Sequence, residues 1–147
     1  MVAGSRSSFT SASRALFAAC AESGRVRLVI QLSALGADEG AATAYHLSKK
    51  AADDYLASLP LASWIVQPSL IYGKDGDSAR VFRMLASMPF TVRFGDAPQL
   101  VQPVHIDDVA EAFVALLRAP PPDPGRRMPL VGPGPLPFLD YIGALRR

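Results

Sequence analysis

Hydrophobic and polar positions along the chain follow two different periods, and these predict helices and strands in alternation. Apolar residues recur at helical spacing over residues 8–23, and Gly24 follows them as a plausible helix end. Residues 25–32 instead alternate every second position and are rich in branched side chains, which predicts a strand. The next stretch, residues 33–42, is rich in Gly, Ala, Ser and Asp and is expected to be a loop.

The same alternation continues after the loop. Thr43 can cap a helix over residues 44–58, which Pro60 follows. A strand is expected over residues 63–67 and ends at Pro68. This order of elements predicts an α/β fold with a parallel sheet.

The second half of the chain predicts shorter elements and one strongly amphipathic helix. In chain order we expect a loop at 68–77, a helix at 78–87, extended pieces at 91–94 and 100–102, a helix at 109–118 with Asp108 as its N-cap, a Pro-rich linker at 119–127, a short strand at 128–131 and a helix from 138 to 147. Because two clear strands do not form a stable sheet, part of the sheet is expected to come from elsewhere.

The composition of residues 1–147 suits one compact domain and argues against several classes of partner. Half of the residues are hydrophobic, charged residues make up 19%, and the net charge is only +2. The arginines are scattered rather than gathered on one stripe, so we expect no nucleic-acid partner. No apolar stretch reaches the ~18 residues of a membrane span, and a cytoplasmic location is the default expectation.

Several polar residues have structural interpretations that outweigh functional ones. The two histidines are too isolated to form a metal site, so no bound metal is expected. Asp53 and Asp54 each follow a lysine by four positions, which favours pairs along the helix face over acid catalysis. Cys20 falls among apolar helix positions and is expected to be a small hydrophobic residue.

The residues most suggestive of chemistry are Tyr45, Lys49 and Ser33. Tyr45 and Lys49 are four positions apart on an expected helix, so their side chains share a face. An ammonium close to a phenol favours the phenolate, and a tyrosine in that setting can exchange a proton with a substrate oxygen. Ser33 follows the first expected strand, and ligands of open α/β sheets bind at the carboxyl ends of strands.

Further stretches in the same order carry a resemblance to a known family. They are Arg27–Asp38, which contains Ser33; Tyr45–Lys49, a Tyr-x-x-x-Lys motif; Trp64–Gly73; Gln102–Ala112, with His-Ile-Asp-Asp-Val-Ala at its centre; and Leu130–Leu136. Together they resemble the short-chain dehydrogenase/reductase superfamily, in the extended or atypical branch of NAD(P)-dependent epimerase-like proteins related to the complex I accessory subunit. The resemblance covers residues 8–147.

The resemblance implies a fold, a cofactor and a set of roles. It implies the carboxyl half of a Rossmann-like doubly wound parallel sheet, serving NAD or NADP in an oxidoreductase or sugar-nucleotide epimerase. Tyr45 would be the general acid/base, Lys49 its partner and a ribose ligand, and Ser33 the hydroxyl that orients a carbonyl. The residues expected beside the nicotinamide are Pro68, Ser69, Leu70 and Ile71.

One departure from the family leaves other functions open. The Gly-x-x-Gly-x-x-Gly turn that holds the pyrophosphate has no counterpart in the sequence, so the amino-terminal nucleotide-binding part is expected to be missing. A catalytically inactive binding or scaffold subunit and a dinucleotide-sensing regulator of the same fold are therefore alternatives. The small-molecule substrate is not indicated, and a homo-oligomer is compatible with the resemblance.

Overall fold

The computed structural model describes residues 4–73 and 100–144, which fall into two compact units. The first unit contains the described residues up to Pro68 together with Phe113–Pro129. The second contains the described residues of Ser69–Ala112 and those from Leu130 onward. The expected helix at 78–87 and the extended piece at 91–94 lie outside the described residues.

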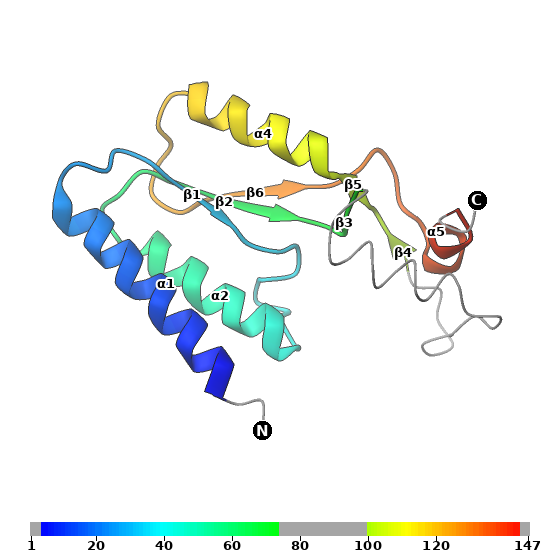
Figure 1. Ribbon diagram of the computed structural model, residues 1–147, viewed down its shortest axis with the longest axis horizontal. Helices are drawn as coiled ribbons and strands as arrows, with labels where there is room; N and C mark the ends of the chain where they lie inside the picture. Colours follow the sequence, from blue (N-terminus) through cyan, green and yellow to red (C-terminus); the bar gives the residue numbers. More distant parts are fainter. Residues whose placement is uncertain (1–3, 74–99, 145–147) are drawn as a thin grey trace. The chain divides into compact units, whose positions relative to one another are not determined.

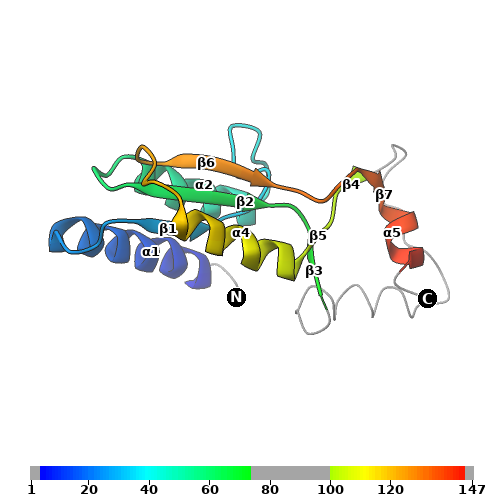
Figure 2. The same cartoon turned by 90° about the horizontal axis from the view of Figure 1, so that it is seen from above.

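The first unit is built on a three-stranded sheet. Its strands are β1 (Val29–Leu32), β2 (Ser63–Pro68) and β6 (Arg126–Leu130), of which β6 ends at the boundary with the second unit. Their order is β1-β2-β6, so β2 is central and β1 forms an edge (Figure 2). Strands β1 and β2 are parallel, with Val29 opposite Ser63 and Leu32 opposite Val66. The arrows of β2 and β6 also point the same way (Figure 1).

Helices cover both faces of this sheet. Helices α1 (Gly4–Ser23) and α2 (Ala44–Ala57) lie on one face, and the end of α4 (Ile106–Arg118) lies on the other (Figure 1). Four buried apolar side chains form the core between the first two helices and the sheet: Phe17, Ala52, Leu56 and Ile65. Burial of this apolar surface is the main force that holds the two helices on the sheet.

The second unit consists of short pairings around a small apolar cluster. Strand β3 (Ile71–Tyr72) pairs in parallel with β5 (Val104–His105), and β4 (Leu100–Val101) pairs antiparallel with β7 (Leu136–Pro137). Helix α5 (Phe138–Ala144) contributes the buried residues of the cluster, Tyr141 and Ile142.

The expected α/β class with a parallel sheet is confirmed, and so are most of the expected elements. Helix α2 has Thr43 as its N-cap, and the hydroxyl of Thr43 accepts a hydrogen bond from the backbone N–H of His46. Gly24 follows α1 with a φ of 61°, a conformation that glycine adopts without a steric cost. Among residues 4–73 and 100–144, no helix combines the length and the hydropathy needed to cross a bilayer.

The expected start of the amphipathic helix is wrong. Helix α4 begins at Ile106, so Asp108 lies in its first turn and is not its N-cap. The ring nitrogen Nδ1 of His105 accepts a hydrogen bond from the N–H of Asp107, at 3.2 Å. A side chain before the helix therefore satisfies one of the N–H groups that a helix leaves open at its start.

Candidate functional site

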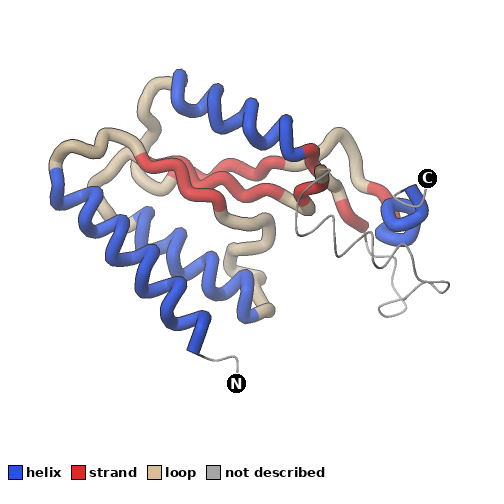
Figure 3. Tube along the Cα trace, viewed as in Figure 1, coloured by secondary structure: helices blue, strands red, loops and turns tan. Residues whose placement is uncertain are grey.

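Ser33 lies directly after β1, where the chain turns away from the sheet toward α2 (Figure 3). Its backbone N–H donates to the carbonyl of Val66 at 2.7 Å, which extends the pairing of β1 with β2 by one residue. The side chain is buried. The hydroxyl of Ser33 is thus fixed at the carboxyl end of a parallel strand, where α/β proteins place their ligands.

Lys49 on α2 reaches the same strand end. Its ammonium donates a hydrogen bond to the backbone carbonyl of Leu32, at 3.1 Å. The N–H groups of Val29 and Ser33 both point to β2, and the two backbone groups of a strand residue point to the same side. The carbonyl of Leu32 therefore points away from β2, to the outer edge of β1. This contact brings the charge of Lys49 to the peptide group that precedes Ser33.

Tyr45 lies one turn before Lys49 on the same helix. The ammonium of Lys49 is 5.9 Å from the centre of the Tyr45 ring, so the expected common face of this pair is present. The Tyr45 side chain is exposed, with a fractional exposure of 56%.

Two opposing effects act on the pKa of Lys49, which is lowered overall. Partial burial lowers the pKa of the Lys49 ammonium, and the negative charge of Asp53 acts in the opposite direction. Burial disfavours the charged form because water no longer solvates it, whereas a nearby carboxylate favours that form.

The structure gives Asp53 a partner that its spacing along the helix does not indicate. Asp53 is fully buried, and its Oδ2 accepts a hydrogen bond from the hydroxyl of Ser33. Its position does carry a signal in the sequence, because it follows Tyr45 by eight positions and Lys49 by four and so belongs to their helix face. Lys50 and Asp54, by contrast, form the expected surface pair, at 2.6 Å.

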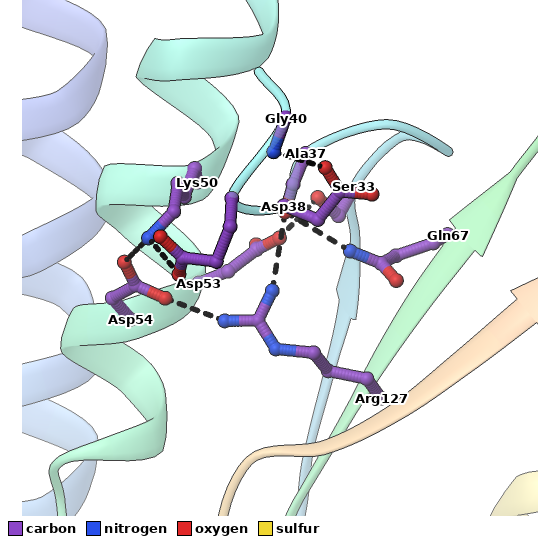
Figure 4. A network of polar contacts seen from close by, with 10 residues as sticks. Ser33, Ala37, Asp38, Gly40, Lys50, Asp53, Asp54, Gln67 and Arg127 are labelled. Carbon is purple, nitrogen blue, oxygen red and sulfur yellow. Dashed lines mark hydrogen bonds and ion pairs between the residues drawn. The ribbon is translucent and has the colours of Figure 1, made fainter.

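Two side chains fix the loop that follows Ser33. The carbonyl of Ala37 accepts a hydrogen bond from the amide of Gln67 at 3.3 Å and another from the guanidinium of Arg127 at 3.1 Å (Figure 4). Arg127 also pairs with the carboxylate of Asp54 on α2. Since Ala37 is fully buried, these donors supply hydrogen bonds that water would otherwise provide. Strands β2 and β6 thereby hold the loop between β1 and α2.

The residues expected beside the nicotinamide are divided between the two units. Pro68 ends β2 in the first unit, and its carbonyl accepts a hydrogen bond from the N–H of Leu35 at 2.8 Å. Ser69, Leu70 and Ile71 belong to the second unit. There the hydroxyl of Ser69 donates a hydrogen bond to the backbone carbonyl of Gln102, which belongs to the same unit.

Comparison with known sequences finds a match that covers only part of the chain. No family model matches the chain. A ceramide reductase from Caulobacter vibrioides is 30% identical over 92 residues, which cover 62% of this chain and 29% of the relative.

Comparison with solved structures covers nearly the whole chain. A dTDP-glucose 4,6-dehydratase from Streptomyces venezuelae, solved with NAD, matches with a TM-score of 0.73 and 19% identity over 95% of this chain and 50% of that one. An NAD-dependent NDP-hexosamine 5,6-dehydratase of tunicamycin biosynthesis matches with a TM-score of 0.71 and 23% identity, over 93% and 51%. The UDP-glucose 4-epimerase of Thermus thermophilus, solved with NAD, gives 0.65 and 22%, over 88% and 50%.

These matches identify the fold. The chain spans about half the length of each of these three structures. The chain therefore has the Rossmann-like α/β fold of these dehydratases and epimerases, as the sequence predicts.

Proposed function

We propose that this chain supplies the Ser-Tyr-Lys part of an NAD(P)-dependent oxidoreductase or epimerase-type enzyme. One observation carries the proposal: the ammonium of Lys49 is bound to the carbonyl of Leu32, directly beside Ser33 at the carboxyl end of β1. A hydroxyl at a strand end, a lysine beside it and a tyrosine one helical turn from that lysine are residues suited to chemistry at a carbonyl or alcohol carbon.

In this proposal each side chain has one task. Tyr45 gives its phenolic proton to a carbonyl oxygen during reduction, or takes the hydroxyl proton during oxidation. Lys49 favours the phenolate between these steps through its positive charge, and it binds a ribose hydroxyl. Ser33 forms a hydrogen bond with the reacting oxygen and so orients the substrate. NAD or NADP, when bound, accepts or supplies the hydride.

The residues of the chain fit one end of such a cofactor. The ammonium of Lys49 offers a donor, and the backbone carbonyls at the end of β1 offer acceptors, for the hydroxyls of a ribose. The sequence contains no Gly-rich turn between a strand and a helix for the pyrophosphate. In the proposed enzyme, the pyrophosphate is therefore held by polypeptide other than these 147 residues.

The names of the relatives suggest which substrates to screen. A ceramide reductase is related in sequence, and enzymes acting on dTDP-glucose and UDP-glucose are related in fold. Ceramide-type lipids and nucleotide sugars are therefore the two classes that we would test first, with NADH and NADPH.

Calorimetric titration of the purified chain with NAD(H) and NADP(H) tests the proposal. We expect micromolar to millimolar binding that Lys49→Ala weakens at least about tenfold, which corresponds to roughly 1.4 kcal/mol. Lys50→Ala is the matched control, because Lys50 is its neighbour on α2 but pairs with Glu39 and Asp54 on the surface.

Turnover with a responsive substrate tests the role of Tyr45 separately. Tyr45→Phe should abolish turnover and leave cofactor binding nearly unchanged. Tyr55→Phe is the control and should affect neither, because the Tyr55 ring packs under Arg14. Absence of cofactor binding by the folded chain, or equal losses in the Lys49 and Lys50 variants, would contradict the proposal.

A further inference from the structure

The carboxyl of Asp53 is the one buried acidic group among the described residues, and it lies beside the proposed site. It is fully buried on α2, and its Oδ2 accepts the hydrogen bond from Ser33. Its other oxygen, Oδ1, is buried and has no hydrogen-bond partner in the described part of the chain. A carboxylate normally accepts several hydrogen bonds, so an oxygen left without a donor is costly when the group is charged.

Opposing effects act on the pKa of Asp53. Burial raises the pKa of Asp53, and the hydrogen bond from Ser33 lowers it, as do the positive charges of Arg127 on β6 and Lys49 on α2. The neighbouring carboxylate of Asp54 adds a small effect that raises the pKa. Burial is the largest of these effects, so the neutral acid persists to a higher pH than in an exposed aspartate.

The hydroxyl of Ser33 has a single hydrogen to donate, and Asp53 competes for it. A charged Asp53 can only accept, so it holds this hydrogen and leaves lone pairs on Oγ. A neutral Asp53 can donate its own proton to Oγ, which releases the hydrogen of Ser33 for another acceptor. The hydrogen bond between Ser33 and Asp53 can therefore run either way. Ser33 donates when Asp53 is charged, and Asp53 donates when it is protonated.

We propose that Asp53 is a positioning residue that sets the direction of the Ser33 hydrogen bond and thereby decides whether Ser33 offers a hydrogen or a lone pair to the reacting oxygen. The proposal rests on the function proposed above for Ser33. With neutral Asp53, Ser33 donates to a substrate carbonyl, as reduction requires. With charged Asp53, Ser33 offers only lone pairs and does not donate to the reacting oxygen.

NMR titration of the isotope-labelled full chain tests the coupling without any cofactor or substrate. We would follow the carboxyl carbon of Asp53 and the Cβ of Ser33 between pH 3 and pH 9, at signals assigned through the backbone. Both signals should shift with one common midpoint, above the value of about 4 that is usual for aspartate. Ser33→Ala should raise the Asp53 midpoint, since it removes a hydrogen bond that favours the charged form. Ser48→Ala, whose hydroxyl binds the backbone of its own helix, is the matched control and should leave the midpoint unchanged.

The variant Asp53→Asn provides a second test of the proposal. Its amide has nearly the same shape and does not titrate, so the Ser33 signal should lose its pH dependence. Different midpoints for Asp53 and Ser33, or an Asp53 midpoint unaffected by Ser33→Ala, would overturn the proposal even if Asp53→Asn failed to fold. If the midpoints are coupled but the chain binds no cofactor, the proposed function fails and the control of Ser33 by Asp53 stands.

Discussion

Neighbouring aspartates on α2 lie in opposite environments, and this gives a prediction at the residue scale. Burial raises the pKa of Asp53. Partial burial acts in the same direction on Asp54, but hydrogen bonds from Lys50 and Arg127 outweigh it, so the pKa of Asp54 is lowered. The two residues therefore change the free energy of unfolding in opposite directions as the pH changes.

The direction in which each residue changes the free energy of unfolding follows from the protons bound in the folded and unfolded states. The stability contributed by Asp53 is full below the unfolded pKa of about 4 and declines as the pH rises through the raised value. The stability contributed by Asp54 is present above about pH 4 and is lost as the pH falls through the lowered value. Urea denaturation from pH 3 to pH 8 should show Asp53→Asn gaining stability relative to wild type as the pH rises, and Asp54→Asn losing it. Parallel curves for the two variants would contradict these assignments.

The candidate site was predictable from the sequence only where a motif names its residues. The spacing of Tyr45 and Lys49 and the place of Ser33 after a strand were sufficient to select them. The sequence does not single out Asp53, because a lysine four positions before it equally well explains an aspartate paired along the helix face. Only the packing of α2 against the sheet shows that this part of the helix face is buried.

The cap of α2 gives a prediction at the scale of the element. The hydroxyl of Thr43 accepts from the N–H of His46 and so satisfies an open donor in the first turn. Thr43→Ala should cost about 1 kcal/mol in the free energy of unfolding, measured by urea denaturation. Thr43→Ser keeps the acceptor and should cost much less. Equal losses in both variants would mean that the methyl group of Thr43, rather than its cap, stabilises the helix.

The buried face of α2 gives a second prediction at this scale. Leu56 is fully buried in the cluster with Phe17, Ala52 and Ile65. Leu56→Ala should cost about 2–5 kcal/mol, because it removes apolar contacts and leaves a cavity. Leu47→Ala, on the same helix but half exposed, should cost less than about 1 kcal/mol. Similar thermal and urea stabilities of the two variants would contradict the packing of α2 on the sheet.

The elements of the fold were predictable where the periodic pattern is long. Helices α1 and α2 agree with their expected ranges within a few residues because each packs against the sheet. Strand β2 is buried along nearly its whole length and agrees within one residue. The two-residue strands β3 and β7 carry no period and were not predicted separately. The start of α4 was missed because a histidine before the helix, rather than an aspartate, satisfies an N–H of its first turn.

At the scale of the whole molecule, the edge of the sheet is the feature with the largest consequence. The chain spans about half the length of the solved structures that share its fold, and β1 is an edge strand of the described sheet. The backbone groups of Ile30 and Leu32 point away from β2, and Lys49 occupies the carbonyl of Leu32. A lysine at an exposed edge hinders the addition of another strand.

Hydrogen exchange measured residue by residue tests this arrangement. The N–H groups of Val29 and Ser33 donate to β2 and should exchange slowly, whereas those of Ile30 and Leu32 should exchange at least about tenfold faster. Val66, in the central strand, provides a protected reference. Equal protection of all four would mean that another strand pairs with β1. Repeating the measurement at lower protein concentration would then separate pairing with a second copy, whose protection falls on dilution, from pairing within one chain, whose protection stays constant. Lys49→Ala should increase any pairing between copies, because it removes the charge that occupies the outer carbonyl of β1.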